Sequence, residues 1–309
     1  MIPRFFIFGA GYSARAFAAT RNDPPTGIAG TTRSPEKFDA LRRVGIDPFL
    51  FDGNALSPEL LAWLNEATHL IVSIAPEERG DPVLAIAREQ IGDLAPRLRW
   101  IGYLSTVGVY GDHGGGLVDE ASECRPVSRR STLRAAAEKE WLELGEGTGV
   151  KVAILRLSGI YGPGRNAFVN LRSGTAKRLI KPGQVFNRIH VADIAGALWH
   201  LAQREQGGIF NITDDLPAPP QDVVTYAAEL MGVAPPPEIS FASAQLSPMA
   251  RSFYGENKRV SNAAIKGTGY QFRYPDYRSA FDAMWAAGDW KGEGASDARS
   301  QMKRQLSRP

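Results

Sequence analysis

The sequence predicts an α/β fold in which a doubly wound parallel sheet carries a smaller, loop-rich lobe in its C-terminal half. In the first half of the chain, apolar runs of strand length alternate with amphipathic segments of helix length, which is typical of βαβ units. The length of 309 residues exceeds one typical domain core and falls short of two full-sized domains. A hydrophobic fraction of 43% and a charged fraction of 22% exclude a disordered, collagen-like or coiled-coil chain.

The first half supplies six strands with helices between them. Ser34-Pro35-Glu36 and Asp81-Pro82 each place an N-cap side chain before a proline, a pattern typical of a helix start. Because parallel crossovers are right-handed, this order predicts a doubly wound sheet that binds its ligands at the carboxyl ends of the strands. The strands are expected at residues 5–8, 28–31, 48–51, 69–74, 100–105 and 152–157, and the helices at 13–21, 34–45, 82–98 and 131–144.

Proline and glycine clusters interrupt this rhythm beyond Leu157 and predict the smaller lobe. A helix at 189–203, capped near Asp193, and a strand at 209–212 still resemble pieces of the sheet domain. From Lys291 onward Gly, Ser and charged residues dominate, which predicts a flexible basic tail. The expected division is a sheet domain of residues 1–161 with 186–215 returning to it, a lobe of 162–185 and 216–290, and a tail of 291–309.

The surplus of positive charge belongs to the tail. The net charge is +3, and residues 291–309 hold five basic and two acidic side chains, which leaves 31 of each sign in the rest of the chain. Because the body has no net field to attract a polyanion, we expect no nucleic-acid partner. Cys124, the single cysteine, excludes an intrachain disulfide and a cysteine-rich metal site, and it fits a reducing, cytoplasmic compartment.

Neither a membrane partner nor a metal ion is expected. No apolar run approaches the ~18 residues that a membrane span requires. The histidines have no metal-ligand spacing; they are His69, His113, His190 and His200.

A glycine-rich turn stands directly after the first strand and opens the first helix. It reads G-x-G-x-x-A from Gly9 to Ala14. Gly9 permits the tight turn, Gly11 lets a pyrophosphate approach the backbone, and Ala14 lets the helix pack closely on the strand. Unpaired N–H groups of the helix start, at Tyr12 and Ser13, would face the phosphates. The turn predicts a Rossmann dinucleotide site for NADP or NAD; the alternative is a tight turn that binds nothing.

The residues after the next strands bear on which dinucleotide binds. Arg33 follows the second strand with no acid before Glu36, which favours the 2′-phosphate of NADP over the ribose diol of NAD. The alternative for Arg33 is a solvated surface arginine. Asp52 could accept a hydrogen bond from the adenine amine or cap the following turn. Ser73 and Ala75 suit a wall beside the cofactor ribose, and a plain strand end explains them nearly as well.

With the fifth strand the sequence resembles a known family. LSTVGVYG at residues 104–111 is similar to the S-S-x-x-V-Y-G segment of the extended short-chain dehydrogenase/reductases, which include nucleotide-sugar epimerases and dehydratases. RLSGIYGPG at 156–164 resembles R-x-x-N-x-Y-G-P-G, and RIHVADIA at 188–195 resembles x-I-H-V-x-D-x-A. The likeness covers residues 1–287. Phe8 at the first glycine of the family's longer turn and Gly159 at its asparagine place the chain nearest the atypical members.

The resemblance implies catalytic residues and also shows a departure. Thr106 matches the hydroxyl that orients the substrate carbonyl. The family's Y-x-x-x-K helix reads Arg130 and Arg134 here. Because a guanidinium keeps its proton in proteins, Arg130 cannot relay one, whereas Arg134 could hold a ribose hydroxyl. Tyr110 or Tyr161 could replace the missing acid, or could serve packing. Asp112 and His113 are further candidates by position.

Two functions follow as hypotheses. The first is an NAD(P)-dependent oxidoreductase or epimerase-like enzyme acting on a carbonyl or sugar-nucleotide substrate. The second is a non-catalytic NAD(P)-binding redox sensor, which needs no positioned acid. Arg188 and Tyr161 are the expected substrate-binding residues. For Arg129-Arg130 the alternative to substrate binding is a solvated helix start. An anionic substrate would suit the arginines, which are Arg125, Arg129, Arg130, Arg134 and Arg188. The resemblance further implies a homodimer through helices at 82–98 and 131–144.

Overall fold

The protein is built on a seven-stranded sheet in which every neighbouring pair is parallel. The computed structural model describes residues 3–20, 27–94 and 97–292. The strand order is β11-β7-β5-β4-β1-β2-β3, so the order in which strands are added across the sheet reverses between β1 and β4. This is the Rossmann-like α/β fold that the sequence predicts. The strands are β1 (Phe5–Phe8), β2 (Ile28–Thr32), β3 (Asp47–Leu50), β4 (His69–Val72), β5 (Trp100–Thr106), β7 (Lys151–Leu157) and β11 (Gly208–Ile212).

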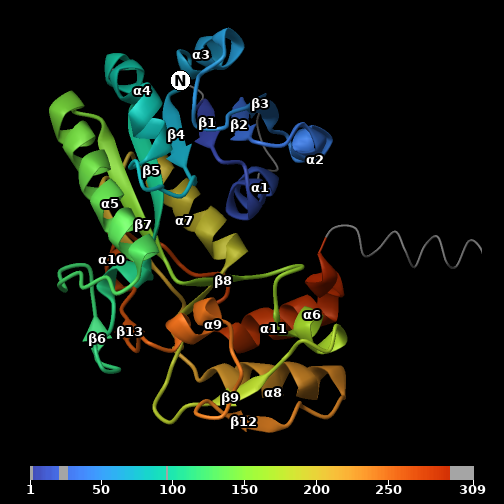
Figure 1. Ribbon diagram of the computed structural model, residues 1–309. Coiled ribbons are helices and arrows are strands. Elements are labelled where there is room, and N and C mark those ends of the chain that lie inside the picture. Colours follow the sequence, from blue (N-terminus) through green and yellow to red (C-terminus); the bar gives the residue numbers. More distant parts are fainter. Residues whose placement is uncertain (1–2, 21–26, 95–96, 293–309) are drawn as a thin grey trace, which may run out of the picture.

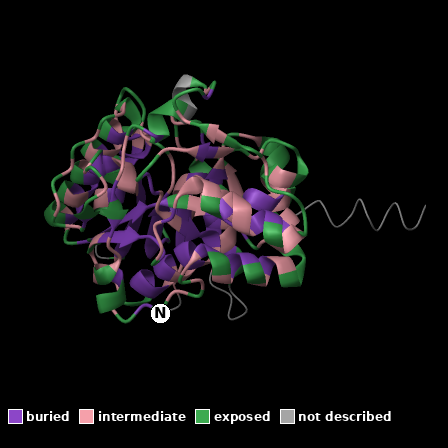
Figure 2. Ribbon diagram, turned by 90° about the horizontal axis from the view of Figure 1, so that it is seen from below, coloured by how far each residue is buried: buried purple, intermediate pink, exposed green. Residues whose placement is uncertain are grey.

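Helices cover both faces of the sheet, and the central strands between them are buried (Figures 1 and 2). Successive side chains of a strand point to opposite faces. Phe5 and Ile7 therefore pack with the helices of one layer, and Phe6 and Phe8 with those of the other. The first layer holds α1 (Tyr12–Ala19), α2 (Phe38–Arg43) and α7 (Val191–Gln203); the second holds α3 (Pro58–Leu64), α4 (Pro82–Asp93) and α5 (Arg129–Thr148).

Helix α5 is longer than predicted because its glycines do not end it. A Cβ on Gly145 would lie 2.6 Å from Cγ2 of Val152, so the glycine lets the helix approach β7. The helix ends instead at Gly149, which has a left-handed φ of 77°. The helix expected to begin at Ser34 also starts differently from the prediction. Ser34 provides no side-chain cap, and a 3-10 turn, η1 (Pro35–Lys37), precedes α2.

The start of α7 also differs from the prediction. Residues 188–190 form the strand β10 (Arg188–His190), which pairs with β8 (Gly159–Tyr161). The cap is His190, whose Nδ1 accepts the N–H of Ala192. Asp193 instead accepts the N–H groups of Arg273 and Tyr274 and the hydroxyl of Tyr270, so it anchors a later segment of the chain.

A smaller group of elements lies beside the carboxyl ends of the strands (Figure 1). It has its own apolar core, which includes Tyr161, Phe168 and Phe281. Its elements are α6 (Ala167–Arg172), β9 (Arg178–Ile180), α8 (Pro220–Met231), β12 (Glu238–Ser240), α9 (Pro248–Phe253), α11 (Tyr277–Ala287) and η3 (Asp289–Lys291). We call this group the small lobe.

One part of the range expected for the lobe packs on the sheet instead. Helix α10 (Ala263–Gly267) contacts β11, and Ile265 and Tyr270 belong to the core on the α7 side. Before it, β13 (Arg259–Val260) pairs with β6 (Leu117–Val118). Most of the expected basic tail, residues 293–309, lies outside the described residues, as do 21 and 95–96. Within the described ranges no helix is both long and apolar enough to cross a membrane.

Candidate functional site

The glycine-rich turn has one glycine in a left-handed conformation and one glycine whose face is open. Gly9 has a left-handed φ of 89°, and a Cβ there would lie 3.0 Å from Cγ1 of Ile74. Its N–H donates to Oγ1 of Thr31 at 2.9 Å, which fixes the turn on β2. Gly11 has an extended backbone, and a Cβ there would meet no heavy atom within 4 Å. Internal packing therefore explains Gly9 and leaves the face of Gly11 open to a ligand.

The start of α1 matches this open face. Gly11 is the N-cap residue and supplies no side chain to accept the first N–H groups of the helix. Ser13 and Ala14 are buried against the sheet. Tyr12 points the other way, and its hydroxyl donates to the carbonyl of Pro163 at 2.9 Å; burial raises its pKa to about 12. The turn thus offers backbone donors to an anion such as a pyrophosphate, and Tyr12 joins it to the small lobe.

The residues expected at the adenosine end lie after β2, β3 and β4. Arg33 is exposed directly after β2, and within the described chain it forms no ion pair. Both carboxylate oxygens of Asp52 accept hydrogen bonds from Asn54 at 3.0 Å, which lowers the pKa of Asp52. Of its two expected roles, the structure displays the turn cap. Ser73 is half-buried at the end of β4, and Ala75 is exposed.

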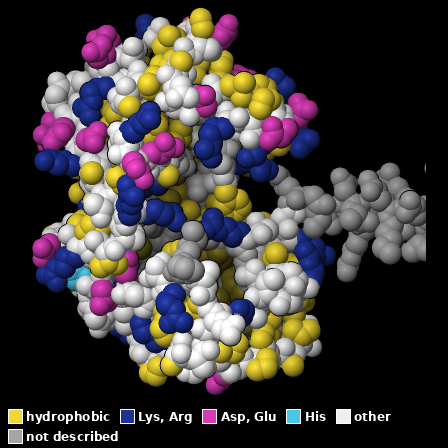
Figure 3. All heavy atoms as spheres, in the orientation of Figure 1, with side chains coloured by type: hydrophobic (Ala, Val, Ile, Leu, Met, Phe, Trp, Pro, Cys, Tyr) yellow, Lys and Arg dark blue, Asp and Glu magenta, His cyan; other side chains and the backbone are white. Residues whose placement is uncertain are grey.

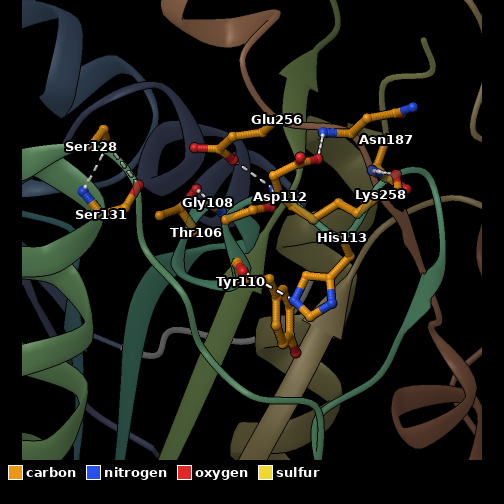
Figure 4. Close-up of polar contacts among 12 residues, drawn as sticks. Thr106, Gly108, Tyr110, Asp112, His113, Ser128, Ser131, Asn187, Glu256 and Lys258 are labelled. Carbon is orange, nitrogen blue, oxygen red and sulfur yellow. Dashed lines mark hydrogen bonds and ion pairs between the residues drawn. The ribbon is translucent and has the colours of Figure 1, made fainter.

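Arg134 and Thr106 stand at the carboxyl ends of β4 and β5. Nη1 of Arg134 donates to the carbonyl of Leu104 at 2.7 Å and to the carbonyl of Ile74 at 3.4 Å, so the guanidinium ties the two strand ends together. Oγ1 of Thr106 accepts the N–H of Gly108 at 3.1 Å, next to the Ser128–Ser131 pair at the start of α5 (Figure 4). Within the described chain the hydroxyl proton of Thr106 has no acceptor, so it can be donated to a ligand.

Tyr110 is not a free acid. The residue is fully buried, and its hydroxyl donates to Oδ1 of Asn211 at 2.8 Å while it accepts from Nη1 of Arg156 at 3.0 Å. The same arginine forms a buried ion pair with Glu138, at 2.7 Å, and Glu138 also accepts the hydroxyl of Ser105. Sequence reasoning missed this network, because it joins α5 to β5, β7 and β11. The hydroxyl of Tyr110 is therefore already occupied by protein partners, and a catalytic role for Tyr110 stays a prediction.

Asp112 and His113 belong to a loop fastened to the segment before β13 (Figure 4). Asp112 is exposed and accepts the N–H of Asn257, and this hydrogen bond is the largest of the effects that lower its pKa. Nε2 of His113 donates to the carbonyl of Tyr110 at 3.1 Å. Lys258 is buried and donates to the carbonyl of Gly111 and to Glu256, at 2.7 and 2.6 Å. These contacts hold the loop in place.

Tyr161 and Arg188 lie at the junction of the sheet and the small lobe. Nη1 of Arg188 donates to the carbonyls of Phe186 and Ala218, at 2.9 and 3.0 Å. The hydroxyl of Tyr161 is buried with no hydrogen-bond partner among the described residues. Nearby, burial raises the pKa of Asp214 to about 8. The junction gives Arg188 a structural role, and contact of either residue with a substrate stays a prediction.

A hollow separates the sheet above from the small lobe below, and Lys and Arg side chains gather along its edges (Figure 3). Arg130 is exposed and helps to line a pocket of about 440 Å³ with Arg79, a residue that the sequence analysis did not single out. The sequence signal that could have identified Arg79 is its position in the loop after β4, at the same edge of the sheet as the other site residues. Within the described chain no group of His, Cys, Asp or Glu side chains is placed to hold a metal ion.

Comparisons with known proteins find a matching family model, a curated relative and solved structures of the same fold. The family model for the NAD dependent epimerase/dehydratase family matches residues 97–213. Protein YeeZ of Escherichia coli K12 is 30% identical over 285 residues, which is 87% of this chain and 96% of that protein. A functionally unknown conserved protein from Silicibacter pomeroyi DSS has a solved structure with 44% identity and a TM-score of 0.84, covering 93% of this chain and 99% of that one. The human epimerase family protein SDR39U1, solved with NADPH, has 18% identity and a TM-score of 0.68, covering 92% and 99%.

Proposed function

The chain belongs to the NAD dependent epimerase/dehydratase family, within the extended short-chain dehydrogenase/reductases, and from this premise we propose that it is an NAD(P)-dependent oxidoreductase or epimerase-like enzyme. Its substrate would be a carbonyl compound or a sugar nucleotide. The observation that carries the proposal is the open backbone face at Gly11, beside the uncapped start of α1.

The residues present fit a dinucleotide. Gly9 fixes the turn, and the face of Gly11 is clear for a pyrophosphate to accept the N–H groups of Tyr12 and Ser13. Arg134, already held by the ends of β4 and β5, is placed to donate to a ribose hydroxyl. When bound, the nicotinamide would supply or accept a hydride.

Thr106 would orient the substrate. Because its Oγ1 already accepts the N–H of Gly108, the hydroxyl is held in one place and its proton is left for an outside acceptor. A carbonyl oxygen is such an acceptor, and a donor fixed beforehand stabilises negative charge that develops on it. Thr106 would therefore hold and polarise the carbonyl without itself losing a proton.

The preferred cofactor would be NADP. Arg33 is exposed after β2 and, among the described residues, has no carboxylate partner, so its fork is available to a 2′-phosphate. We expect the wild type to bind NADPH more tightly than NADH, and Arg33→Asp to weaken NADPH binding by about 10-fold or more. Calorimetric titration checks this, and equal affinities in the wild type would defeat it.

Turnover is tested by hydride consumption with purified protein over a panel of carbonyl compounds and sugar nucleotides. Thr106→Ala should lower kcat/KM by about 10- to 100-fold, because it removes one hydrogen bond to developing charge. Thr132→Ala is the matched control, since Thr132 is exposed on α5 and its hydroxyl, among the described residues, bonds only to the carbonyl of Ser128. Turnover that is unaffected by Thr106→Ala would refute the assignment of Thr106.

A redox sensor without turnover is the second candidate. The observation that favours it is that Arg130 stands where a tyrosine would relay a proton, while the hydroxyl of Tyr110 is fully engaged. Both candidates bind the dinucleotide, so binding does not separate them. Tight NADPH binding with no hydride consumption on any member of the panel would select the sensor.

We also propose a homodimer that pairs through α4 and α5. The two helices lie on the same face of the sheet, joined by an ion pair between Arg88 and Glu140 at 3.3 Å. Ala136 is exposed on α5. Sedimentation equilibrium should find a dimer for the wild type and a monomer for Ala136→Arg, and a monomeric wild type would contradict the proposal.

A further inference from the structure

A pocket opens beside the start of α5 that the proposed chemistry does not use. It has a volume of about 440 Å³, and we call it the arginine pocket. One side comes from the connection between β4 and α4, and the other from the first turns of α5. Its lining residues are Glu77, Glu78, Arg79, Arg129, Arg130 and Leu133.

The arginine pocket lies beyond the carboxyl end of β4, where the reacting end of a bound dinucleotide would be expected. In a doubly wound sheet the dinucleotide crosses the point where the strand order reverses, here between β1 and β4. Its adenosine end would then lie over β2, near Arg33, and its nicotinamide end over β4 and β5. Arg134 binds the carbonyls of Ile74 and Leu104 at the ends of those two strands. Arg130 precedes it by one turn on the same face of the helix.

The charges in the arginine pocket are unevenly paired. Arg129 forms an ion pair with Glu78 at 2.7 Å. The side chains of Arg79 and Arg130 are exposed and have no ion pair or hydrogen bond within the described part of the chain. Glu77 also lines the pocket and has no ion pair within the described residues. The pocket therefore holds three guanidinium groups and two carboxylates, a net charge of +1. A planar guanidinium matches the paired oxygens of a carboxylate or phosphate, and such bonds are stronger than neutral ones.

Building on the proposed function, we propose that Arg79 and Arg130 bind an oxyanion of the substrate, a carboxylate or a phosphate, so that the enzyme acts on anionic carbonyl compounds. Arg130 then has a binding role at the position where it cannot relay a proton. Because the pocket is open to solvent, the attraction is screened by salt and is greatest at low ionic strength.

The first test measures oxyanion binding directly. Inorganic phosphate and oxalate are titrated by calorimetry into the full chain, with and without saturating NADPH, at low salt. The double variant Arg79→Gln/Arg130→Gln should weaken binding by about 10-fold or more for each arginine lost. The matched control is Arg42→Gln/Lys266→Gln, which removes the same charge from exposed ion pairs outside the pocket and should leave the affinity unchanged.

The second test measures substrate preference. Two pairs of aldehydes each differ by one anionic group: propanal with succinic semialdehyde, and glyceraldehyde with glyceraldehyde 3-phosphate. The wild type should prefer the anionic member by about 10-fold or more in kcat/KM. The double variant should lose this preference through KM. The pair with the larger preference identifies the anion as carboxylate or phosphate.

Three outcomes would overturn the inference. One is an oxyanion affinity, or an anionic preference, that is the same in the wild type and the double variant. Another is a wild type that binds neither phosphate nor oxalate. The third is a larger loss of NADPH affinity than of NADH affinity in the double variant, since Arg79 and Arg130 would then hold the cofactor's phosphate. If the wild type binds neither dinucleotide, the proposed function fails, while the titrations without NADPH still judge the pocket.

Discussion

Replacing Gly11 with alanine should separate cofactor binding from folding. Gly11 has φ −85° and ψ −154°, an extended conformation that alanine adopts, and its Cβ would have no heavy atom within 4 Å. The folded state therefore gains no strain. Because alanine also restricts the unfolded chain, we expect the free energy of unfolding to stay unchanged or to rise by about 0.4–1 kcal/mol.

The same methyl group should weaken cofactor binding. It would stand on the open face where a phosphate oxygen must come within about 3 Å of a backbone nitrogen to accept its N–H. Loss of one such charge-assisted hydrogen bond costs about 1.5–3 kcal/mol, so we expect NADPH affinity to fall by at least about 10-fold.

Gly9→Ala is the matched variant, two residues away in the same turn. Gly9 has φ 89°, which costs an alanine roughly 1–2 kcal/mol. Its Cβ would also lie 3.2 Å from the backbone nitrogen of Ile74 and 3.3 Å from the carbonyl carbon of Ser73, atoms that a rotamer change cannot move. We expect this variant to lose about 2–3 kcal/mol of unfolding free energy.

Urea unfolding followed by tryptophan fluorescence measures the stabilities, and calorimetric titration measures NADPH affinity. A Gly11→Ala protein that binds NADPH as tightly as the wild type would refute the placement of the pyrophosphate on this face. A Gly9→Ala protein as stable as Gly11→Ala would refute the strain argument.

Two further predictions concern buried charge. Burial raises the pKa of Asp214 from 3.8 to about 8, so the folded state binds a proton that the unfolded state releases, and the stability of the wild type falls as pH rises from 3.8 to about 8. Asp214→Asn should therefore be more stable than the wild type by a few kcal/mol at pH 8 and equal to it near pH 4; a pH-independent difference in urea midpoints would contradict this. Glu138→Gln should cost about 3–5 kcal/mol, because it leaves the guanidinium of Arg156 buried without its charge partner. Glu140→Gln, on the exposed side of the same helix, should cost less than about 1 kcal/mol, and equal losses in urea unfolding would count against the role of burial.

The strands of the seven-stranded sheet could be predicted because their signal is local. A run such as Phe5 to Phe8 is apolar throughout since a parallel strand is covered on both faces, and this run stands directly before the glycine turn. Helix ends were predicted less well. Gly145 in the sequence resembles a terminator, and only its contact with Val152 explains why the helix continues through it. Likewise, pairing of β10 with β8 removes Ile189 and His190 from the expected helix, and that contact joins segments far apart in the chain.

The candidate site likewise has residues that the sequence locates and residues that it does not. The glycine turn, Arg33 and Thr106 follow strand ends, so a pattern in the sequence locates them at one edge of the sheet. The partners of Tyr110 come from β7 and β11, and no local pattern reveals that its hydroxyl is already occupied. Sequence reasoning missed Arg79 because its neighbour in the pocket, Arg130, lies far along the chain on α5, beyond α4, β5 and β6.

The position of β11 at the sheet edge has a consequence for synthesis on the ribosome. Its residues, 208–212, pair with β7, so a nascent chain that has not yet exposed them carries β7 as an open edge. Asn211 is also missing until then, and the hydroxyl of Tyr110 lacks its acceptor. The sheet is therefore complete only after α6 and β9 of the small lobe have been translated. A stalled chain shorter than this would expose β7 as an edge strand that can pair with another chain.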